Sequence, residues 1–254
     1  MVFSVEERDR VRARLLARAE ADEAVVGAAW TGSHAVAAGD RWSDTDLVLA
    51  VRGGLAATVD RWTRWLRSAL GARHHWDLRS DTSTVRVFLL PGWLEVDLTF
   101  TPEAEFGPRG PQWHTVFGRT RTPEPFPEPD GNALAGLLWH HVLHAFVCLQ
   151  RGHRWQAAYW IGAVRDHVVT LACLRLGLPA AHAKGAHLLP DELAAELETT
   201  LVRSLDGPDL RRALTAAVTV AAGELRRSDP ALAARLSPLL AELEEANERA
   251  AGGR

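Results

Sequence analysis

The chain has 254 residues, of which 47% are hydrophobic and 24% are charged, and these values exclude a largely disordered protein. Its formal net charge of −3 argues against a dedicated nucleic-acid-binding protein, because such proteins usually carry a basic excess. The N-terminus is charged where a signal peptide needs an apolar core, and no stretch approaches the roughly 18 apolar residues of a membrane span. We therefore expect a cytoplasmic protein without membrane contact.

The first part of the chain predicts a mixture of helices and strands. Ser4, followed by Glu6 and Glu7, has the form of a helix N-cap with an acidic first turn, which favours a helix over 4–21. A second helix is expected over 55–70. Strands are expected over 24–30, 44–51, 74–78, 85–90 and 93–100, the last two joined by a hairpin turn at Pro91-Gly92.

The second part of the chain predicts helices alone. Seven prolines between Thr101 and Asp130 disfavour regular structure, and helical periodicity begins at Gly131. The expected helices are 131–151, 154–177, 190–206, 208–227 and 229–249. Cys148 and Cys173 fall in apolar helical patterns, which indicates small core residues in a reducing compartment.

The predicted fold class is therefore α+β. It consists of a small mixed-sheet domain over residues 1–120, a proline-rich connector over 121–130 and an α-helical bundle domain over 131–254.

The most informative stretch joins the first two strands. Gly32-Ser33 forms a small turn with a hydroxyl group, and ten residues later Asp44 and Asp46 stand at the beginning of an apolar strand. Residues two apart in a strand point to the same face, so the two carboxylates are expected side by side. Adjacent carboxylates repel each other unless a cation neutralises them, and hard oxygen ligands suit Mg²⁺ that also binds phosphate oxygens.

A third carboxylate follows on a later strand. Asp97 alternates with apolar residues, which places it on the polar face of a strand expected beside the Asp44 and Asp46 strand. Three such carboxylates suit phosphoryl transfer assisted by two metal ions. Gly32 allows the backbone to approach phosphate oxygens, and Ser33 offers a hydroxyl and an N–H group. Glu95, on the same face as Asp97, is a rival for the general base.

This combination resembles the signature of the nucleotidyltransferase superfamily of the DNA polymerase beta type. Its residues here are Gly32-Ser33, Asp44-x-Asp46 and Asp97, so the motif covers residues 32 to 97. The small sheet domain followed by a helical bundle resembles the bacterial aminoglycoside and lincosamide adenylyltransferases. Thr31 and Thr45 stand where the family pattern prefers apolar residues, although both are β-branched and suit a strand.

The resemblance implies an enzyme that transfers a nucleoside monophosphate, usually AMP from ATP, to a hydroxyl group and releases pyrophosphate. It implies two Mg²⁺ ions held by Asp44, Asp46 and Asp97, with Ser33 on the triphosphate and Asp97 or Glu95 as the base toward the acceptor. Because the chain lacks a basic tract, a small hydroxylated molecule is expected as acceptor rather than RNA or DNA. The family contains both monomers and dimers, so a homodimer stays open.

The helical part carries fewer signals. Lys184, beside Gly185 in a loop, is a candidate for phosphate contact. His140 and His144 share one helix face, and we interpret them as polar or stacking residues rather than a metal pair. For Trp155 and Tyr159, core packing is favoured over stacking on a ligand.

Two other functions fit the same residues. One is the transfer of AMP onto a protein, as in nucleotidyltransferases of toxin–antitoxin systems, although those usually encode the helical partner separately. The other is a nucleotide-binding regulatory module without catalysis, and the presence of Asp97 argues against it.

Overall fold

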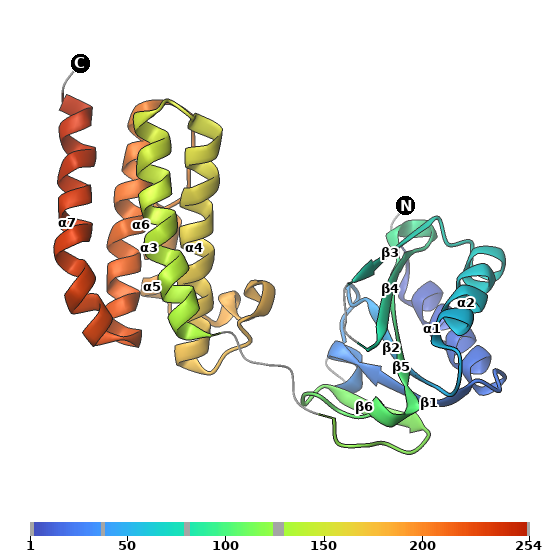
Figure 1. Ribbon diagram of the computed structural model, residues 1–254. Coiled ribbons are helices and arrows are strands. Elements are labelled where there is room, and N and C mark those ends of the chain that lie inside the picture. Colours follow the sequence, from blue (N-terminus) through green and yellow to red (C-terminus); the bar gives the residue numbers. More distant parts are fainter. Residues whose placement is uncertain (1–2, 37–38, 79–81, 124–129, 253–254) are drawn as a thin grey trace. The chain divides into compact units, whose positions relative to one another are not determined.

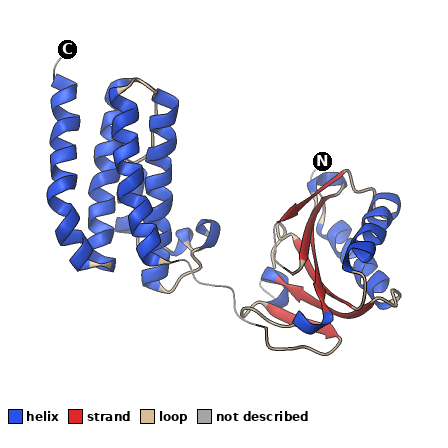
Figure 2. Cartoon of the chain, in the orientation of Figure 1, coloured by secondary structure: helices blue, strands red, loops and turns tan. Residues whose placement is uncertain are grey.

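The computed structural model describes residues 3–36, 39–78, 82–123 and 130–252. The chain divides into two compact units, Met1–Pro127 and Glu128–Arg254 (Figure 1). Strands occur in the first unit, whereas the second unit contains helices and loops (Figure 2). The predicted α+β fold class is therefore confirmed. Most of the proline-rich connector expected over 121–130 lies outside the described residues.

The first unit is built on a mixed six-stranded sheet with strand order β3-β4-β5-β2-β1-β6. Parallel pairing joins β2 to β5, and the other neighbours are antiparallel. The elements are α1 (Val5–Glu20), β1 (Val25–Thr31), β2 (Thr45–Val51), α2 (Leu55–Ala69), β3 (His74–Leu78), β4 (Thr84–Leu89), β5 (Glu95–Pro102) and β6 (Trp113–Phe117).

The helices α1 and α2 cover one face of this sheet (Figure 1). Leu47, Leu98 and Phe100 project from the strands into the core, where they meet Leu15 of α1 and Trp62 of α2. Each side chain of this size contributes about 1.5–3 kcal/mol when it is fully buried. The alternate residues of β2 and β5 face the opposite side of the sheet, and that side carries the polar groups of interest.

The start of α1 follows the sequence closely. Ser4 Oγ accepts a hydrogen bond from the Glu7 backbone N–H at 3.1 Å, and the Glu7 carboxylate accepts one from the Ser4 N–H at 2.8 Å. This reciprocal capping box satisfies two N–H groups that a helix start would otherwise leave without partners.

Two predictions for the first unit were wrong. β6 occupies a segment that was expected to be irregular, because residues 113–117 lie between the prolines and pair with β1. Trp93 was expected to begin a strand but lies in the hairpin turn with a φ of 63°, and β5 begins at Glu95.

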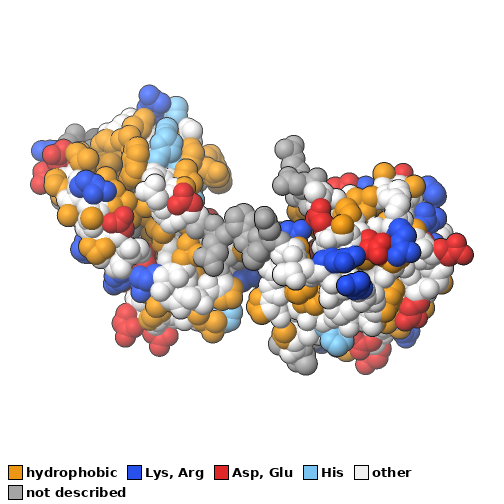
Figure 3. Space-filling view, turned by 60° about the horizontal axis from the view of Figure 1, so that its bottom comes forward, with side chains coloured by type: hydrophobic (Ala, Val, Ile, Leu, Met, Phe, Trp, Pro, Cys, Tyr) orange, Lys and Arg blue, Asp and Glu red, His pale blue; other side chains and the backbone are white. Residues whose placement is uncertain are grey.

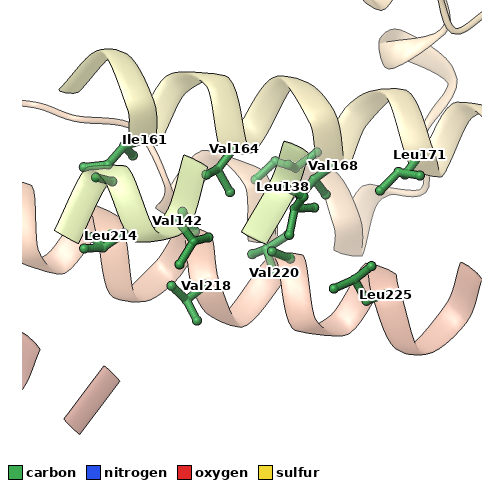
Figure 4. Packing of buried hydrophobic residues seen from close by; sticks show 14 of the residues in the cluster. Leu138, Val142, Ile161, Val164, Val168, Leu171, Leu214, Val218, Val220 and Leu225 are labelled. Carbon is green, nitrogen blue, oxygen red and sulfur yellow. The ribbon is translucent and has the colours of Figure 1, made fainter. Parts of the chain in front are cut away.

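The second unit is a helical bundle. Its helices are α3 (Gly131–Gln150), α4 (Arg154–Leu176), α5 (Asp191–Thr199), α6 (Gly207–Ser228) and α7 (Pro230–Gly252). Aliphatic side chains of α3, α4 and α6 interlock at its centre, including Leu138, Ile161 and Val218 (Figure 4). Cys148 and Cys173 are free and buried, as expected for core residues.

Helix α5 is shorter than expected because polar contacts draw the chain away after Thr199. Arg212 donates hydrogen bonds to the carbonyl groups of Thr199 and Leu201 at 2.6 and 2.7 Å. Asp209 Oδ2 accepts from the backbone N–H groups of Arg203 and Ser204. These contacts replace the hydrogen bonds that a longer helix would make.

Among the described helices, α3 is long and apolar enough to cross a membrane, with a mean hydropathy of 1.3, although no such stretch was expected. The helix contains no Asp, Glu, Lys or Arg, so it meets this criterion despite its three histidines. A core helix of a soluble bundle meets the same criterion of length and composition.

Candidate active site

The predicted motif residues lie at one edge of the sheet. β1 ends at Thr31, while β2 begins at Thr45 and β5 at Glu95. Because β1 is antiparallel to β2 and β5 is parallel to it, the end of β1 meets the beginnings of the other two strands. This topology brings together three segments that span residues 31 to 95 of the chain.

Asp46 and Asp97 are direct partners on the neighbouring strands β2 and β5. Register partners project to the same face, and neighbouring strands lie about 4.8 Å apart. Both side chains are partly exposed, on the face opposite to Leu47 and Leu98 of the core. The structure thus places these two predicted carboxylates side by side.

Glu95 and Asp44 lie further out. Glu95 is exposed at the first position of β5, two residues before Asp97, which places both on one strand face. Asp44 precedes β2 and is also exposed. Its negative charge acts on His34, so its side chain lies near the turn that follows β1.

Gly32 lies directly against the carboxylate of Asp46. Its φ is +68°, a left-handed conformation that L side chains rarely adopt, and a Cβ atom at this position would overlap Asp46 Oδ2. Glycine is therefore required here both for the backbone conformation and for the close approach of the turn to Asp46.

Ser33 contacts a second hydroxyl group that the sequence analysis did not single out. Ser33 Oγ donates to Ser43 Oγ at 3.0 Å, and Ser43 Oγ donates to Asp40 Oδ1 at 3.1 Å. The hydrogen bond from the Trp42 backbone N–H, and next the one from the Ser43 side chain, lower the pKa of the Asp40 carboxyl. A signal for Ser43 existed in the sequence, since it directly precedes Asp44.

Arg8 fixes the loop that carries Ser43. Its side chain is 5% exposed, and its Nη1 donates to the carbonyl groups of Asp40 at 2.5 Å and Ser43 at 3.4 Å. A buried guanidinium that spans two carbonyl groups restrains the backbone between them. Helix α1 therefore supports the loop that leads into Asp44 and Asp46, a role the sequence analysis missed.

The carboxylates at this edge supply part of the ligand set that a magnesium ion needs. The carboxylates of Asp46 and Asp97 are neighbours, and carboxylate oxygens are the ligands that Mg²⁺ prefers. Across the part of the chain that the structure describes, no three His, Cys, Asp or Glu side chains are grouped as a metal site. Asp44 as a third ligand therefore stays a prediction.

The remaining predicted residues belong to the second unit. Lys184 is exposed in a loop of that unit, and its contact with phosphate stays a prediction. The prediction that Trp155 and Tyr159 pack in the core was wrong, because these residues are 79% and 65% exposed. Ile161 lies on the side of α4 that faces the core, and Trp155 and Tyr159 lie on the other side.

The helical unit instead contains a cluster of aromatic rings. The rings of His140 and His144 lie 4.3 Å apart between centroids, and His141 stacks on His167 of α4 at 4.9 Å. Burial, and then the charges of His167, His140 and His144, lower the pKa of His141 to about 4. Histidine side chains gather among hydrophobic ones on the surface of this unit (Figure 3).

Comparison with solved structures finds similar chains, among them an adenyltransferase. The chain aligns with the crystal structure of an aminoglycoside 6-adenyltransferase from Bacillus subtilis over 93% of this chain and 98% of that chain, with a TM-score of 0.41 and 11% sequence identity. No family model matches the sequence, and a search of curated proteins gives no match.

Proposed function

We propose that the protein is a Mg²⁺-dependent nucleotidyltransferase that transfers a nucleoside monophosphate, AMP from ATP, to a hydroxyl group of a small molecule. The observation that carries this proposal is the pair of in-register carboxylates, Asp46 and Asp97, with Gly32 packed against Asp46. The acceptor class we propose is a hydroxylated antibiotic of the aminoglycoside or lincosamide type.

In the proposed reaction, the acceptor hydroxyl oxygen attacks the α-phosphorus of the nucleotide. A bond forms between this oxygen and phosphorus, and the bond from the α-phosphorus to the bridging oxygen of the β-phosphate breaks. Pyrophosphate leaves with that bonding electron pair. The hydroxyl proton passes to a carboxylate, for which Asp97 and Glu95 are the candidates, because both lie on the exposed face of β5.

The other residues of this edge bind and orient the nucleotide. The Gly32 turn exposes backbone close to Asp46. The Ser33 hydroxyl, which donates to Ser43 in the free protein, would rotate to donate to a phosphate oxygen. Asp46 and Asp97, with Asp44 as the predicted third ligand, would hold the metal. A bound Mg²⁺ supplies charge neutralisation at the phosphates and lowers the pKa of a coordinated hydroxyl.

The test is a pyrophosphate-release assay with labelled ATP, Mg²⁺ and a panel of hydroxylated antibiotics. We expect release with at least one acceptor, together with label on that acceptor. Asp97→Asn and Asp46→Asn should reduce the rate by about 10²–10⁴-fold, the usual contribution of a positioned acid–base group. Glu95→Gln tests the other candidate base: an unchanged rate excludes Glu95 and leaves Asp97, which as a predicted metal ligand is needed for the rate in either case.

The matched control is Glu23→Gln, which changes an exposed carboxylate of the same unit outside this edge and should leave the rate unchanged. If no acceptor releases pyrophosphate above the background of Asp97→Asn, the enzyme proposal fails. If the label appears on a protein instead, the small-molecule acceptor is wrong.

A further inference from the structure

A second feature of the same edge is the side chain of Arg12 on α1. Its guanidinium carbon lies 4.4 Å from the centroid of the Trp30 ring, and its Nη1 lies 2.6 Å from His34 Nδ1. Trp30 is in β1, and His34 follows Ser33 in the turn after that strand. Arg12 therefore lies half-buried beside the Gly32-Ser33 turn.

Among the residues that the structure describes, Arg12 has no carboxylate within 4 Å, and in this it differs from Arg8 and Arg18 on the same helix and from several other arginines of the first unit. The arginines paired with an acidic residue there include Arg8 with Asp9, Arg18 and Arg61 with Asp22, Arg52 with Glu103, and Arg86 with Asp77. Burial lowers the pKa of Arg12, the charge of Asp9 opposes part of this shift, and the charge of Arg8 adds to it, so the net shift is downward. A partly desolvated cation is costly unless an anion compensates it.

His34 orients this guanidinium without neutralising it. Because a guanidinium has only donors, His34 Nδ1 must accept the hydrogen bond, which leaves the imidazole neutral with its proton on Nε2. Burial, and then the charges of Arg12 and Arg8, lower the pKa of His34, which favours this neutral form. His34 is thus a positioning residue for Arg12.

The turn also fixes where the guanidinium lies relative to the carboxylates. Three consecutive residues each contact a different group: Gly32 lies against the Asp46 carboxylate, Ser33 donates to Ser43, and His34 accepts from Arg12. The turn passes around the end of the sheet, because Asp46 lies on the open face whereas Trp30, beneath Arg12, packs with the helix-covered core. A polyphosphate that follows the turn would have carboxylates at one end, hydroxyl groups in the middle and a guanidinium at the other. This is the charge order that a metal-bound triphosphate needs.

We propose that Arg12 binds the terminal phosphates of the nucleotide and hence the leaving pyrophosphate, with His34 holding it in place. The proposal rests on the function proposed above and assigns the orientation of the substrate in that site: the α-phosphate lies at Asp46 and the β- and γ-phosphates lie toward Arg12.

The test compares the binding of pyrophosphate, AMP, ADP and ATP by calorimetry, with Mg²⁺, in wild type, Arg12→Gln and Arg12→Lys. The matched control is Arg14→Gln, which removes one exposed charge from the same helix. In wild type, affinity should rise from AMP to ATP. Arg12→Gln should weaken ATP and pyrophosphate about 10–100-fold, the range for losing hydrogen bonds to a charged group, and leave AMP nearly unchanged.

Three variants test the donor geometry of Arg12 and the role of His34. Arg12→Lys keeps the charge and the stem over Trp30 but loses the planar donor fork, so its affinity for pyrophosphate should be intermediate. His34→Leu should weaken pyrophosphate binding, and His34→Asn should restore part of it, because an amide oxygen can accept from Arg12. Restoration by asparagine is not expected if His34 only fills space.

The outcomes separate this proposal from the enzyme proposal. If wild type binds ATP and pyrophosphate but Arg12→Gln binds them equally well, the assignment of Arg12 is wrong while the enzyme proposal stands. If Arg12→Gln weakens pyrophosphate binding but the wild type transfers no nucleotide, the assignment of Arg12 stands and the enzyme proposal is wrong. If wild type binds neither ligand, both proposals are overturned.

Discussion

The candidate site of the first unit and the buried ion pair of the second unit differ in their exposure to solvent. In the first unit, the carboxylates Asp46 and Asp97 lie on the face of a sheet that the covering helices leave open. In the second unit, the carboxylate of Glu224 is fully buried and paired with Arg175, and His141 stacks between helices. Charges on an open face can be reached by a ligand from solvent, whereas fully buried charges contribute mainly to the choice of packing.

The largest effect that would test this contrast is expected at Gly32. Gly32→Ala should reduce the rate of pyrophosphate release by more than about 100-fold, because displacing a catalytic group by about 1 Å can lower the rate by this factor. The added Cβ would overlap Asp46 Oδ2, so the turn or the carboxylate must move. The rate is measured by pyrophosphate release with the acceptor found in the panel.

Gly53→Ala is the matched control, because Gly53 also has a positive φ but nothing lies within 4 Å of its added Cβ. Both variants should lose about 1–3 kcal/mol of stability from backbone strain, measured by urea unfolding. Equal activity in the two variants would show that the approach of Gly32 to Asp46 has no catalytic role.

The buried pair of the second unit should affect stability rather than activity. Glu224 accepts from Arg175 Nε at 2.7 Å and Nη2 at 2.9 Å, and its side chain is 0% exposed. Glu224→Ala leaves a partly buried guanidinium without its carboxylate and should cost about 2–4 kcal/mol, toward the lower end of the range for breaking a buried pair because Arg175 is partly exposed.

This loss should appear as a lower midpoint of the unfolding transition of the helical unit, followed by far-ultraviolet circular dichroism. The matched control is Glu242→Ala, an exposed carboxylate on α7, which should change stability by less than about 0.5 kcal/mol. If Glu224→Ala is as stable as the control, the buried pair does not stabilise the bundle.

The histidine cluster predicts that the helical unit loses stability in acid. The pKa of His141 is about 4 in the folded protein, whereas a histidine in an unfolded chain has a pKa near 6.5. The unfolded state therefore binds the proton first. The stability from neutral His141 is fully present above pH 6.5 and is lost as pH falls toward 4.

We expect this loss to be about 1–2 kcal/mol, reduced from the full value because His141 is partly exposed to solvent. The pKa of His167 is also lowered by burial, which adds an effect of the same sign. His141→Phe keeps a ring against His167 and should have a flatter pH dependence between 6.5 and 4.5 than wild type. An unchanged slope would contradict the assignment, and exposed His187→Asn serves as control.

For the first unit, the sequence predicted the helices and strands more completely than the contacts between them. Alternation along 93–100 and the apolar run after Asp46 suffice to place Asp97 and Asp46 on strand faces, because side-chain direction in a strand has a fixed period of two. Asp44 was expected on the same strand but lies before it. The register that makes Asp46 and Asp97 neighbours is a long-range property that periodicity does not contain. Arg8, Arg12 and Ser43 were missed for the same reason, because their roles depend on contacts between distant segments.

In the second unit, the sequence did not determine which side of each helix is buried. Helical periodicity predicted all five helices, but not which side of each faces the core, because α3 and α4 are apolar on more than one side. Trp155 and Tyr159 were assigned to the core for that reason and are exposed. The early end of α5 likewise depends on Arg212, which lies in the next helix and gives no local signal at Thr199.

The smallest expected effect concerns the helix that carries Arg8 and Arg12. Ser4→Ala removes the hydroxyl that accepts from the Glu7 N–H and should cost about 1 kcal/mol, the usual value of an N-cap. Because the cap lies one turn before Arg8 and acts on the helix start alone, the affinity for pyrophosphate should stay within about twofold of wild type. Urea unfolding and pyrophosphate titration measure the two quantities. A variant that loses affinity as well as stability would show that the helix start and the phosphate-binding edge are coupled, and the separation between supporting helix and ligand-binding turn would then be wrong.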